Sequence, residues 1–466
     1  MPDPRPGRRS PQRGGRRPDQ RPPRRPAAGR PADPARRAAF ELLRAVAEQD
    51  AYANLVLPAL LTDAGLDTRD AALATELGYG TLRTTGTLDE ILARCVDRSL
   101  DEVDGAVLDL LRLGAYQVLR TRIPAHAAVT TTVDLAPAVG AGRAGGFVNA
   151  VLRRVTARSW DAWTELLAEG RTATGALAVR TAHPEWIVQA FADALGGDLD
   201  ETERALRADD ERPRTHLVAW PGRSTRAELL EAGGGEPGPY SPYAIRMAGG
   251  DPAALSAVRE RRAGVQDEGS QLCALALAAA PLDGPDAHWL DLCAGPGGKA
   301  ALLAALAAER GAVLEANERR EHRAELVRRV TSPWGVTVRV GDGREHPGRP
   351  GGYDRVLVDA PCTGLGALRR RPEARWRRRA DDLAELTALQ RELLTAALQL
   401  VRPGGVVAYV TCSPHPAETL DVVAGLDLLD AREAFPGVPD LGPGPTVQLW
   451  PHRHGTDAMF CALIRA

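Results

Sequence analysis

The chain has 466 residues, 59 lysines plus arginines, 61 acidic residues and a formal net charge of −2 at pH 7. At roughly 150 residues per domain, this length predicts about three domains. Hydrophobic residues make up 44% and charged residues 26% of the sequence, as is ordinary for a globular protein. No apolar run reaches the ~18 residues of a membrane helix, and no secretory signal is recognisable. We therefore expect a multidomain protein of the cytoplasm with no membrane partner.

The N-terminal segment, residues 1–35, is rich in arginine, proline and glycine and contains almost nothing to bury. Such a composition predicts a disordered tail. Ten arginines against two aspartates up to Arg30 make the tail strongly basic, so it would bind nucleic-acid phosphates without sequence preference. A solubilising tail with no partner is the alternative.

Residues 36–158 show the periodicity of helices, as at Leu88, Ile91 and Leu92, and we expect an all-helical domain. Cys95 continues this apolar stripe and is predicted to pack in the core. Three segments in order, 76–83, 123–129 and 147–154, resemble the NusB-like RNA-binding domain. This resemblance implies that the domain binds RNA. Residues 159–262 mix helical patterns with glycine- and proline-rich turns, and we expect a small mixed connecting domain there.

Residues 263–466 change to short apolar runs alternating with helical stretches, which is typical of a doubly wound, Rossmann-like α/β domain. A clear amphipathic helix is predicted over residues 383–400, between the last two strands of the series. The expected strands are 287–292, 312–314, 336–340, 356–358 and 406–410.

Two cysteines follow two of these strands: Cys362 stands in Asp-Ala-Pro-Cys and Cys412 in Thr-Cys-Ser. Ligands bind at the carboxyl ends of strands in open α/β sheets, so a thiol at both ends suggests covalent catalysis. Six cysteines without CxxC spacing argue against a zinc site and against a disulfide framework, so we expect reduced thiols and no metal.

The turn after the first strand, residues 291–299, is rich in glycine and ends in Lys299, the single lysine of the chain. Every other basic residue apart from histidine is arginine, so this lysine indicates a place where the compact ammonium is needed. Alternatively, the lysine has been retained by chance. The turn matches neither GxGxxG nor the P-loop, which disfavours hydride and phosphoryl transfer. The carboxylates Glu315, Asp342 and Asp359 follow the next three strands, and an acid-lined pocket suits S-adenosylmethionine.

Segments 293–299, 359–364 and 411–413 resemble the signature motifs of the RNA cytosine-5 methyltransferases of the NOL1/NOP2/Sun family, and segments 265–271 and 448–457 resemble further parts of it. With the NusB-like domain in front, the chain is similar to the bacterial members that act on small-subunit rRNA. The resemblance implies a class I methyltransferase domain that binds S-adenosylmethionine through ten residues: Cys293, Ala294, Gly295, Pro296, Gly297, Gly298, Lys299, Glu315, Asp342 and Asp359.

The resemblance also implies catalytic roles for the two cysteines, and the chemistry that they need suggests roles for Asp359 and Lys299. Cys412 is expected to attack carbon 6 of a cytosine, and Cys362 to assist release of the product. Asp359 is placed to donate to N3 of the base, and Lys299 is a candidate for the cation that activates the thiol.

An arginine-rich segment, residues 369–379, follows Cys362 and is the predicted RNA contact. Arginines can hold phosphates while an aromatic ring stacks on a base, although a charge run can also be a solvated face. The candidates are Arg369, Arg370, Arg371, Arg375 and Trp376. We expect a monomer whose partner is small-subunit rRNA, bound before or during subunit assembly.

Two other functions were weighed against cytosine-5 methylation. A non-catalytic RNA-binding or antitermination factor would need the NusB-like domain but neither thiol. Amino-directed N-methylation expects an Asn/Asp-Pro-Pro-aromatic loop after the fourth strand, where Asp359-Ala360-Pro361-Cys362 stands instead.

Overall fold

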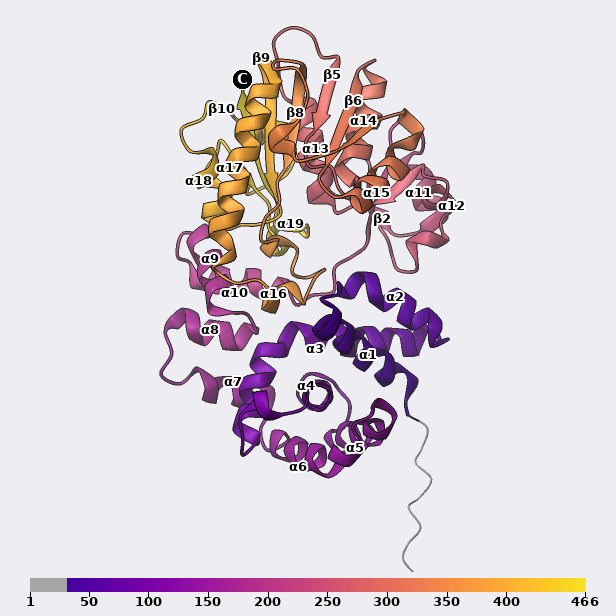
Figure 1. Ribbon diagram of the computed structural model, residues 1–466, viewed down its shortest axis with the longest axis vertical. Coiled ribbons are helices and arrows are strands. Elements are labelled where there is room, and N and C mark those ends of the chain that lie inside the picture. The colour runs from indigo at the N-terminus through magenta and orange to yellow at the C-terminus, as the bar shows by residue number, and fades with distance from the viewer. Residues whose placement is uncertain (1–31) are drawn as a thin grey trace, which may run out of the picture.

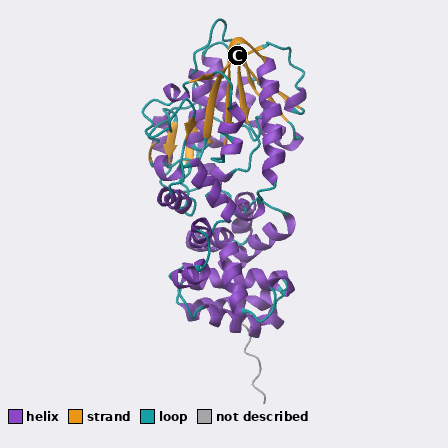
Figure 2. Ribbon diagram, turned by 90° about the vertical axis from the view of Figure 1, so that its left-hand side faces the viewer, coloured by secondary structure: helices purple, strands orange, loops and turns teal. Residues whose placement is uncertain are grey.

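Helices build one end of the molecule and a mixed sheet builds the other (Figures 1 and 2). The computed structural model describes residues 32–466, so nearly all of the predicted basic tail lies outside the described residues. Within residues 32–466, no helix is long and apolar enough to cross a membrane. The predicted fold class is confirmed, because an all-helical N-terminal domain precedes an α/β domain.

Aspartates begin several N-terminal helices: the side chains of Asp33, Asp67 and Asp104 accept hydrogen bonds from backbone N–H groups of the first turns. Leu42, Ile91 and many other apolar side chains form the buried core, and Cys95 is buried among them as predicted. The helices are α1 (Pro34–Gln49), α2 (Ala53–Asp63), α3 (Thr68–Cys95), α4 (Gly105–Arg120), α5 (Ala125–Leu135), α6 (Gly145–Val155), α7 (Trp160–Ala168), α8 (Ala173–Thr181), α9 (Glu185–Ala194) and α10 (Leu199–Ala208).

The range 159–262 is divided among its neighbours. Trp160 and Trp163 of α7 pack into the N-terminal core, whereas Phe191 of α9 contacts Trp450 of the C-terminal domain with ring centroids 5.7 Å apart. A small antiparallel sheet of order β2-β3-β1-β4 follows. It comprises β1 (His216–Ala219), β2 (Glu236–Pro237), β3 (Ala244–Arg246) and β4 (Ala263–Val265), with α11 (Arg226–Gly233) and α12 (Ser256–Arg259).

The C-terminal sheet has the order β10-β12-β9-β8-β5-β6-β7, with β11 paired to β12. Strands β5 to β9 are parallel, and β12 runs antiparallel to β9. The five parallel strands are the five that the sequence predicts, with different ends. The strands are β5 (His288–Asp291), β6 (Val313–Glu318), β7 (Thr337–Val340), β8 (Tyr353–Asp359), β9 (Val401–Thr411), β10 (Leu428–Leu429), β11 (Val447–Gln448) and β12 (Phe460–Arg465).

Alternate strand residues serve opposite faces of this sheet. Trp289 and Leu357 pack in one core with α13 and α14, whereas Leu290 and Val356 pack in a second core with α17 and α18. Both faces are covered, so the strands read as continuous apolar runs. The helices are α13 (Glu268–Ala279), α14 (Gly298–Glu309), α15 (Glu321–Thr331), α16 (Ala374–Arg377), α17 (Asp382–Leu400), α18 (Leu420–Val423) and α19 (Pro451–His454).

A short segment around α16 joins the two ends of the molecule (Figure 1). Arg375 is fully buried and donates to the carbonyls of Arg83 (3.2 Å) and Ala182 (3.1 Å) and to the Asp210 carboxylate (2.9 Å). Trp376 donates its indole N–H to the same Arg83 carbonyl at 3.0 Å. Gly86 makes this approach possible, because a Cβ there would lie 2.1 Å from the Trp376 ring. The α16 segment therefore fixes the catalytic domain on the helical domain.

Replacing Arg375 by alanine should loosen this joint. Asp210 and two carbonyls would lose a buried donor, and breaking a buried ion pair from one side typically costs about 3 kcal/mol. We expect the melting temperature to fall by about 5 °C or more in a thermal unfolding scan, with faster proteolysis between the domains. Arg379→Ala is the control, because the Arg379 side chain is exposed and forms no ion pair within residues 32–466. Equal stability of the two variants would contradict the joint.

Candidate active site

The pairing of β8 with β9 brings the two predicted thiols together. Asp359, the last residue of β8, pairs with Val410 near the end of β9. The loops that follow the two strands therefore begin side by side. The Sγ atoms of Cys362 and Cys412 are 3.5 Å apart. Fifty residues of sequence thus separate two side chains that are in direct contact.

Glu418 holds the loop that carries Cys362. Its buried carboxylate accepts hydrogen bonds from the Thr363 backbone N–H (2.8 Å), the Thr363 hydroxyl and the Gln390 amide (3.1 Å). The loop after β9 is fixed as well, because the Cys412 carbonyl accepts from the Gly366 N–H at 2.9 Å. Sequence analysis passed over Glu418, although a glutamate six residues after the second thiol was the available signal.

The two thiols differ in their electrostatics. The hydrogen bond with Cys362 lowers the pKa of the Cys412 thiol, against the opposing effects of burial and of the Asp359 carboxylate; Lys299 and Arg371 lower it further. The same contact with Cys412, together with burial, raises the pKa of Cys362 well above its ordinary value. A charge-assisted hydrogen bond of this kind stabilises one thiolate and one thiol. These directions favour a thiolate on Cys412 over one on Cys362.

Lys299 and Asp359 form an ion pair beside the thiols, with Nζ and Oδ2 2.9 Å apart. Burial disfavours the Lys299 ammonium, but Asp359 outweighs that penalty and the pKa of Lys299 is raised. Arginine's planar fork would not fit the start of α14, where the lysine is buried. In this pair Lys299 donates to Asp359 Oδ2, whereas the sequence-based expectation has Asp359 donating to the base.

The glycine-rich turn after β5 runs directly against the end of β6. The Gly295 N–H donates to Glu318 Oε2 at 3.1 Å, and a Cβ on Gly295 would lie 2.1 Å from that oxygen. Gly297 adopts φ +112°, in the region that favours glycine, and caps α14. The turn, the N-terminus of α14 and Glu318 together form a cradle at the carboxyl ends of the parallel strands.

Glu315 does not occupy the position that the sequence analysis gave it. Strand β6 continues to Glu318, and Glu315 lies level with Leu290 in the middle of β5. Its carboxylate binds Arg339 and the Tyr353 hydroxyl, away from the glycine-rich turn. The structure thus places Glu315 away from the strand end where the sequence analysis expects it, and Glu318 is the acid at that end. The signal in the sequence for this position was Glu318 itself, a second glutamate three residues after Glu315.

Two more acids lie at strand ends. Asp342 follows β7 and caps a short helix, and its carboxylate is bound by Arg344, which lowers the pKa of Asp342 to about 2. Asp291 ends β5, is fully buried, and has no hydrogen-bond partner for either oxygen among residues 32–466. Burial, and then the nearby Asp359 carboxylate, raise the pKa of Asp291 to about 8. Sequence analysis did not single out Asp291, although it begins the glycine-rich turn.

The arginine-rich segment is mostly internal, which corrects its predicted role as an RNA surface. Arg369 and Arg370 bind Asp267 and Asp457 inside the catalytic domain. Arg375 and Trp376 bind the N-terminal domain as described above. Arg371 alone of the five candidates has an exposed side chain without a hydrogen bond among the described residues.

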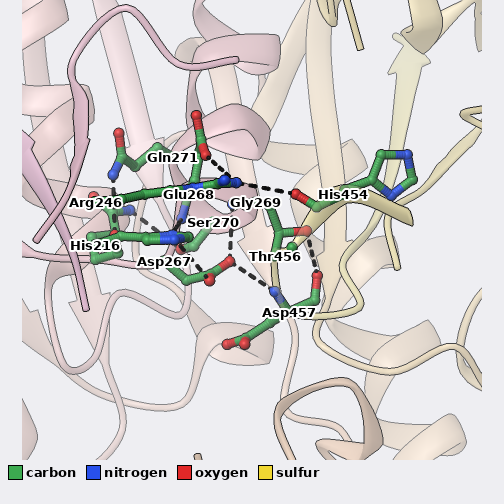
Figure 3. A network of polar contacts seen from close by, with 12 residues as sticks. His216, Arg246, Asp267, Glu268, Gly269, Ser270, Gln271, His454, Thr456 and Asp457 are labelled. Carbon is green, nitrogen blue, oxygen red and sulfur yellow. Dashed lines mark hydrogen bonds and ion pairs between the residues drawn. The ribbon is translucent and has the colours of Figure 1, made fainter. Parts of the chain in front are cut away.

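Asp267 is the centre of a buried polar network that joins two further motifs (Figure 3). Its carboxylate accepts from the Asp457 N–H (3.1 Å), Gly269 N–H (2.9 Å) and Arg370 (2.7 Å). Burial favours the neutral acid, but Arg370 and Arg369 prevail and the pKa of Asp267 is lowered to about 2. Segments 265–271 and 448–457 are therefore structural in this fold.

A doubly wound sheet with an antiparallel last strand, a glycine-rich turn after β5 and an acid at the end of β6 defines an S-adenosylmethionine-dependent methyltransferase. Residues 277–465 match the model of the family described as 16S rRNA methyltransferase RsmB/F, and residues 33–157 match the NusB family. The chain belongs to the RsmB/F methyltransferase family and carries the NusB domain in front.

Three similar proteins agree with this family. A Mycobacterium tuberculosis protein named as a methyltransferase, Rv1407, is 56% identical over 93% of this chain and 96% of its own length. Ribosomal RNA small subunit methyltransferase B of Salmonella paratyphi B is 35% identical over 83% of this chain and 88% of its own. The crystal structure of PH0851 has the same fold, with a TM-score of 0.77 and 24% identity over 93% of this chain and 99% of that one.

Glu318 and Glu315 can be told apart by cofactor affinity. Glu318→Gln should weaken binding of S-adenosylmethionine about tenfold or more in isothermal titration calorimetry, because a charge-assisted hydrogen bond is lost. Glu315→Gln should change the affinity less than about twofold, since Glu315 faces Arg339 and Tyr353. The opposite ranking would restore the sequence-based assignment.

The thiol pair predicts a pH dependence that needs no substrate. Because the pKa of Cys412 is lowered, its alkylation by iodoacetamide should rise with pH through a midpoint below 9, the ordinary thiol value. Cys362→Ala removes the donor, raises that midpoint and slows alkylation of Cys412 at pH 7. Cys362→Ser retains a hydroxyl donor and should preserve more of the rate. Peptide mass spectrometry follows Cys412 alone; an unchanged midpoint in Cys362→Ala would refute the donor role.

Proposed function

We propose that the protein methylates carbon 5 of a cytosine in small-subunit rRNA through a covalent bond between Cys412 and carbon 6. The observation that carries the proposal is the contact of two thiols, 3.5 Å apart, beside a methyl-donor cradle. Carbon 5 of cytosine is a poor nucleophile, and a thiolate at carbon 6 is a direct way to activate it.

The residues at the strand ends fit S-adenosylmethionine. Glu318 can accept from ribose hydroxyls, and Asp342 from the adenine amine. The absence of side chains at Gly295 and Gly297 lets the glycine-rich turn pack closely against Glu318 and Val327. Asp291, whose oxygens have no hydrogen-bond partner among residues 32–466, adds a buried carboxyl group to this acid-rich region. S-Adenosylmethionine supplies an electrophilic methyl group at this place.

Cys412 begins the reaction on the base. Its thiolate forms a bond to carbon 6, which breaks the aromaticity and makes carbon 5 enamine-like. Carbon 5 then takes the methyl group. Lys299, the proton-bearing member of the ion pair, is placed to donate to the ring as negative charge develops, while Asp359 can accept from the exocyclic amine.

Cys362 changes role once Cys412 is bonded to the base. The pKa of Cys362 is raised chiefly because its S–H donates a hydrogen bond to the Cys412 thiolate. A thioether carries no such charge, so the pKa of Cys362 falls after the bond forms. Cys362 can then give its S–H proton to solvent and, as a thiolate, take the proton from carbon 5. The C5–H electron pair forms the C5–C6 double bond, and the C6–S bond breaks to release Cys412 as a thiolate. Glu418 positions Cys362 for this step.

Small-subunit rRNA is the proposed substrate because relatives over most of the chain are named for it and a NusB domain precedes the catalytic domain. A cytosine stacked in a finished subunit is out of reach, so we place the reaction before or during subunit assembly. One chain carries both thiols and the donor cradle, which supports action as a monomer. The thiol contact argues against a purely RNA-binding factor.

Methyl transfer to unmodified small-subunit rRNA tests the proposal directly. Wild type should yield 5-methylcytidine, detected by nucleoside mass spectrometry, and Cys412→Ala should lose activity by at least ~10³-fold because the nucleophile is gone. Cys362→Ala should instead accumulate an RNA–protein adduct that survives a denaturing gel. Absence of 5-methylcytidine with wild type would refute the function, and an adduct with Cys412→Ala would refute the assigned roles.

A further inference from the structure

The N-terminal domain presents an aromatic side chain to the catalytic domain. Tyr52 lies between α1 and α2 and is 47% exposed, which is unusual for a large ring next to an interdomain joint. Figure 1 shows α2 on the side of the helical domain that faces the catalytic domain, next to the segment that leads to α16. The Tyr52 hydroxyl forms no hydrogen bond within residues 32–466.

Two arginines of the catalytic domain lie against this ring. The guanidinium carbon of Arg371 is 5.6 Å from the Tyr52 ring centroid and that of Arg377 is 5.9 Å away. Arg377 is already occupied, because it donates to the carbonyls of Val46 (2.8 Å) and Ala51 (2.7 Å) and pairs with Asp50 (3.1 Å). The Arg371 donors remain free for a ligand.

Arg371 follows a turn that is bonded to the loop of the second thiol. The Gly366 N–H donates to the Cys412 carbonyl at 2.9 Å, and the Arg371 N–H donates to the carbonyl of the next residue, Ala367, at 3.1 Å. Tyr52, Arg371 and Cys412 thus follow one another from the N-terminal domain to the active site. The exposed part of α2 beside Tyr52 adds no opposing charge, because α2 has no acidic residue before Asp63 and Asp50 is paired with Arg377.

We propose that Tyr52 stacks on a nucleotide adjoining the target cytosine while Arg371 binds its phosphate. The inference rests on the proposed function and extends it, because it makes the N-terminal domain one wall of the substrate site. The sequence analysis gave the stacking role to Trp376, whose ring instead packs against Gly86. The Tyr52 ring, by contrast, is partly exposed beside the two arginines.

Single-stranded RNA is the ligand that this combination fits. A base has an apolar face for the ring and a phosphate for the guanidinium, and stacking with phosphate contact is the usual way to bind an unpaired strand. A target cytosine turned out of a helix needs something to hold its neighbours in place. Tyr52 and Arg371 supply both contacts at the entrance to the thiol pair.

Fluorescence anisotropy with a labelled single-stranded rRNA fragment tests the site without requiring turnover. Tyr52→Ala should weaken binding about tenfold, whereas Tyr52→Phe should bind within about twofold of wild type, because the ring and not the hydroxyl carries the contact. Arg371→Ala should weaken binding and reduce the salt dependence by about one phosphate contact. Val313→Ala is the control, since Val313 is 58% exposed at the amino end of β6, far from the strand ends that hold the site.

Methyl-transfer kinetics separate this inference from the proposed function. If wild type forms 5-methylcytidine, Tyr52→Ala should raise KM for RNA about tenfold while kcat changes less. Wild-type affinity and KM in a folded Tyr52→Ala variant would overturn the inference and leave the proposed function standing. If wild type does not methylate the RNA, the proposed function is wrong. The RNA affinities of Tyr52→Ala and Tyr52→Phe, measured by anisotropy, would still decide whether the Tyr52 ring stacks on a base.

Discussion

The parallel pairing of β8 with β9 is the constraint on which the site depends. Because Asp359 pairs with Val410, β8 and β9 end at neighbouring points, and the loops that follow them lie in contact. The thiols come into contact there, and Lys299 reaches the same place from the start of α14. A shift of one residue in this register would turn the strand side chains to the opposite faces and separate the thiols.

The contact between Cys362 and Cys412 gives these two thiols different pKa values. One proton between Cys362 and Cys412 stabilises a thiolate on Cys412 and keeps Cys362 protonated until the thiolate is consumed. The Lys299 ammonium and the Arg371 guanidinium also favour negative charge on Cys412, against the opposing effects of burial and of the Asp359 carboxylate. In the proposed mechanism, the order of chemical steps follows from this electrostatic difference between the two thiols.

Much of this could be predicted from the sequence, and the failures have physical causes. Apolar runs and glycine-rich turns are local signals, so the five parallel strands and the donor turn were predictable. The end of β6 was not, because Glu315 and Glu318 both stand in a polar stretch and only pairing with β7 shows that the strand continues. The burial of Arg375 was equally hidden, since its partners Arg83, Ala182 and Asp210 lie more than 160 residues away. The density of arginines in residues 369–379 suggested a surface that binds RNA. The structure instead shows that acidic residues elsewhere in the protein pair with several of these arginines.

The central claim is that Cys412, and not Cys362, forms the bond to the base. RNA carrying 5-fluorocytidine traps such a bond, because fluorine on carbon 5 cannot leave as a proton does. Wild-type enzyme incubated with this RNA and S-adenosylmethionine, digested and analysed by peptide mass spectrometry, should show the nucleotide attached to the peptide that contains Cys412. Attachment to the Cys362 peptide, or no attachment at all, would contradict the account.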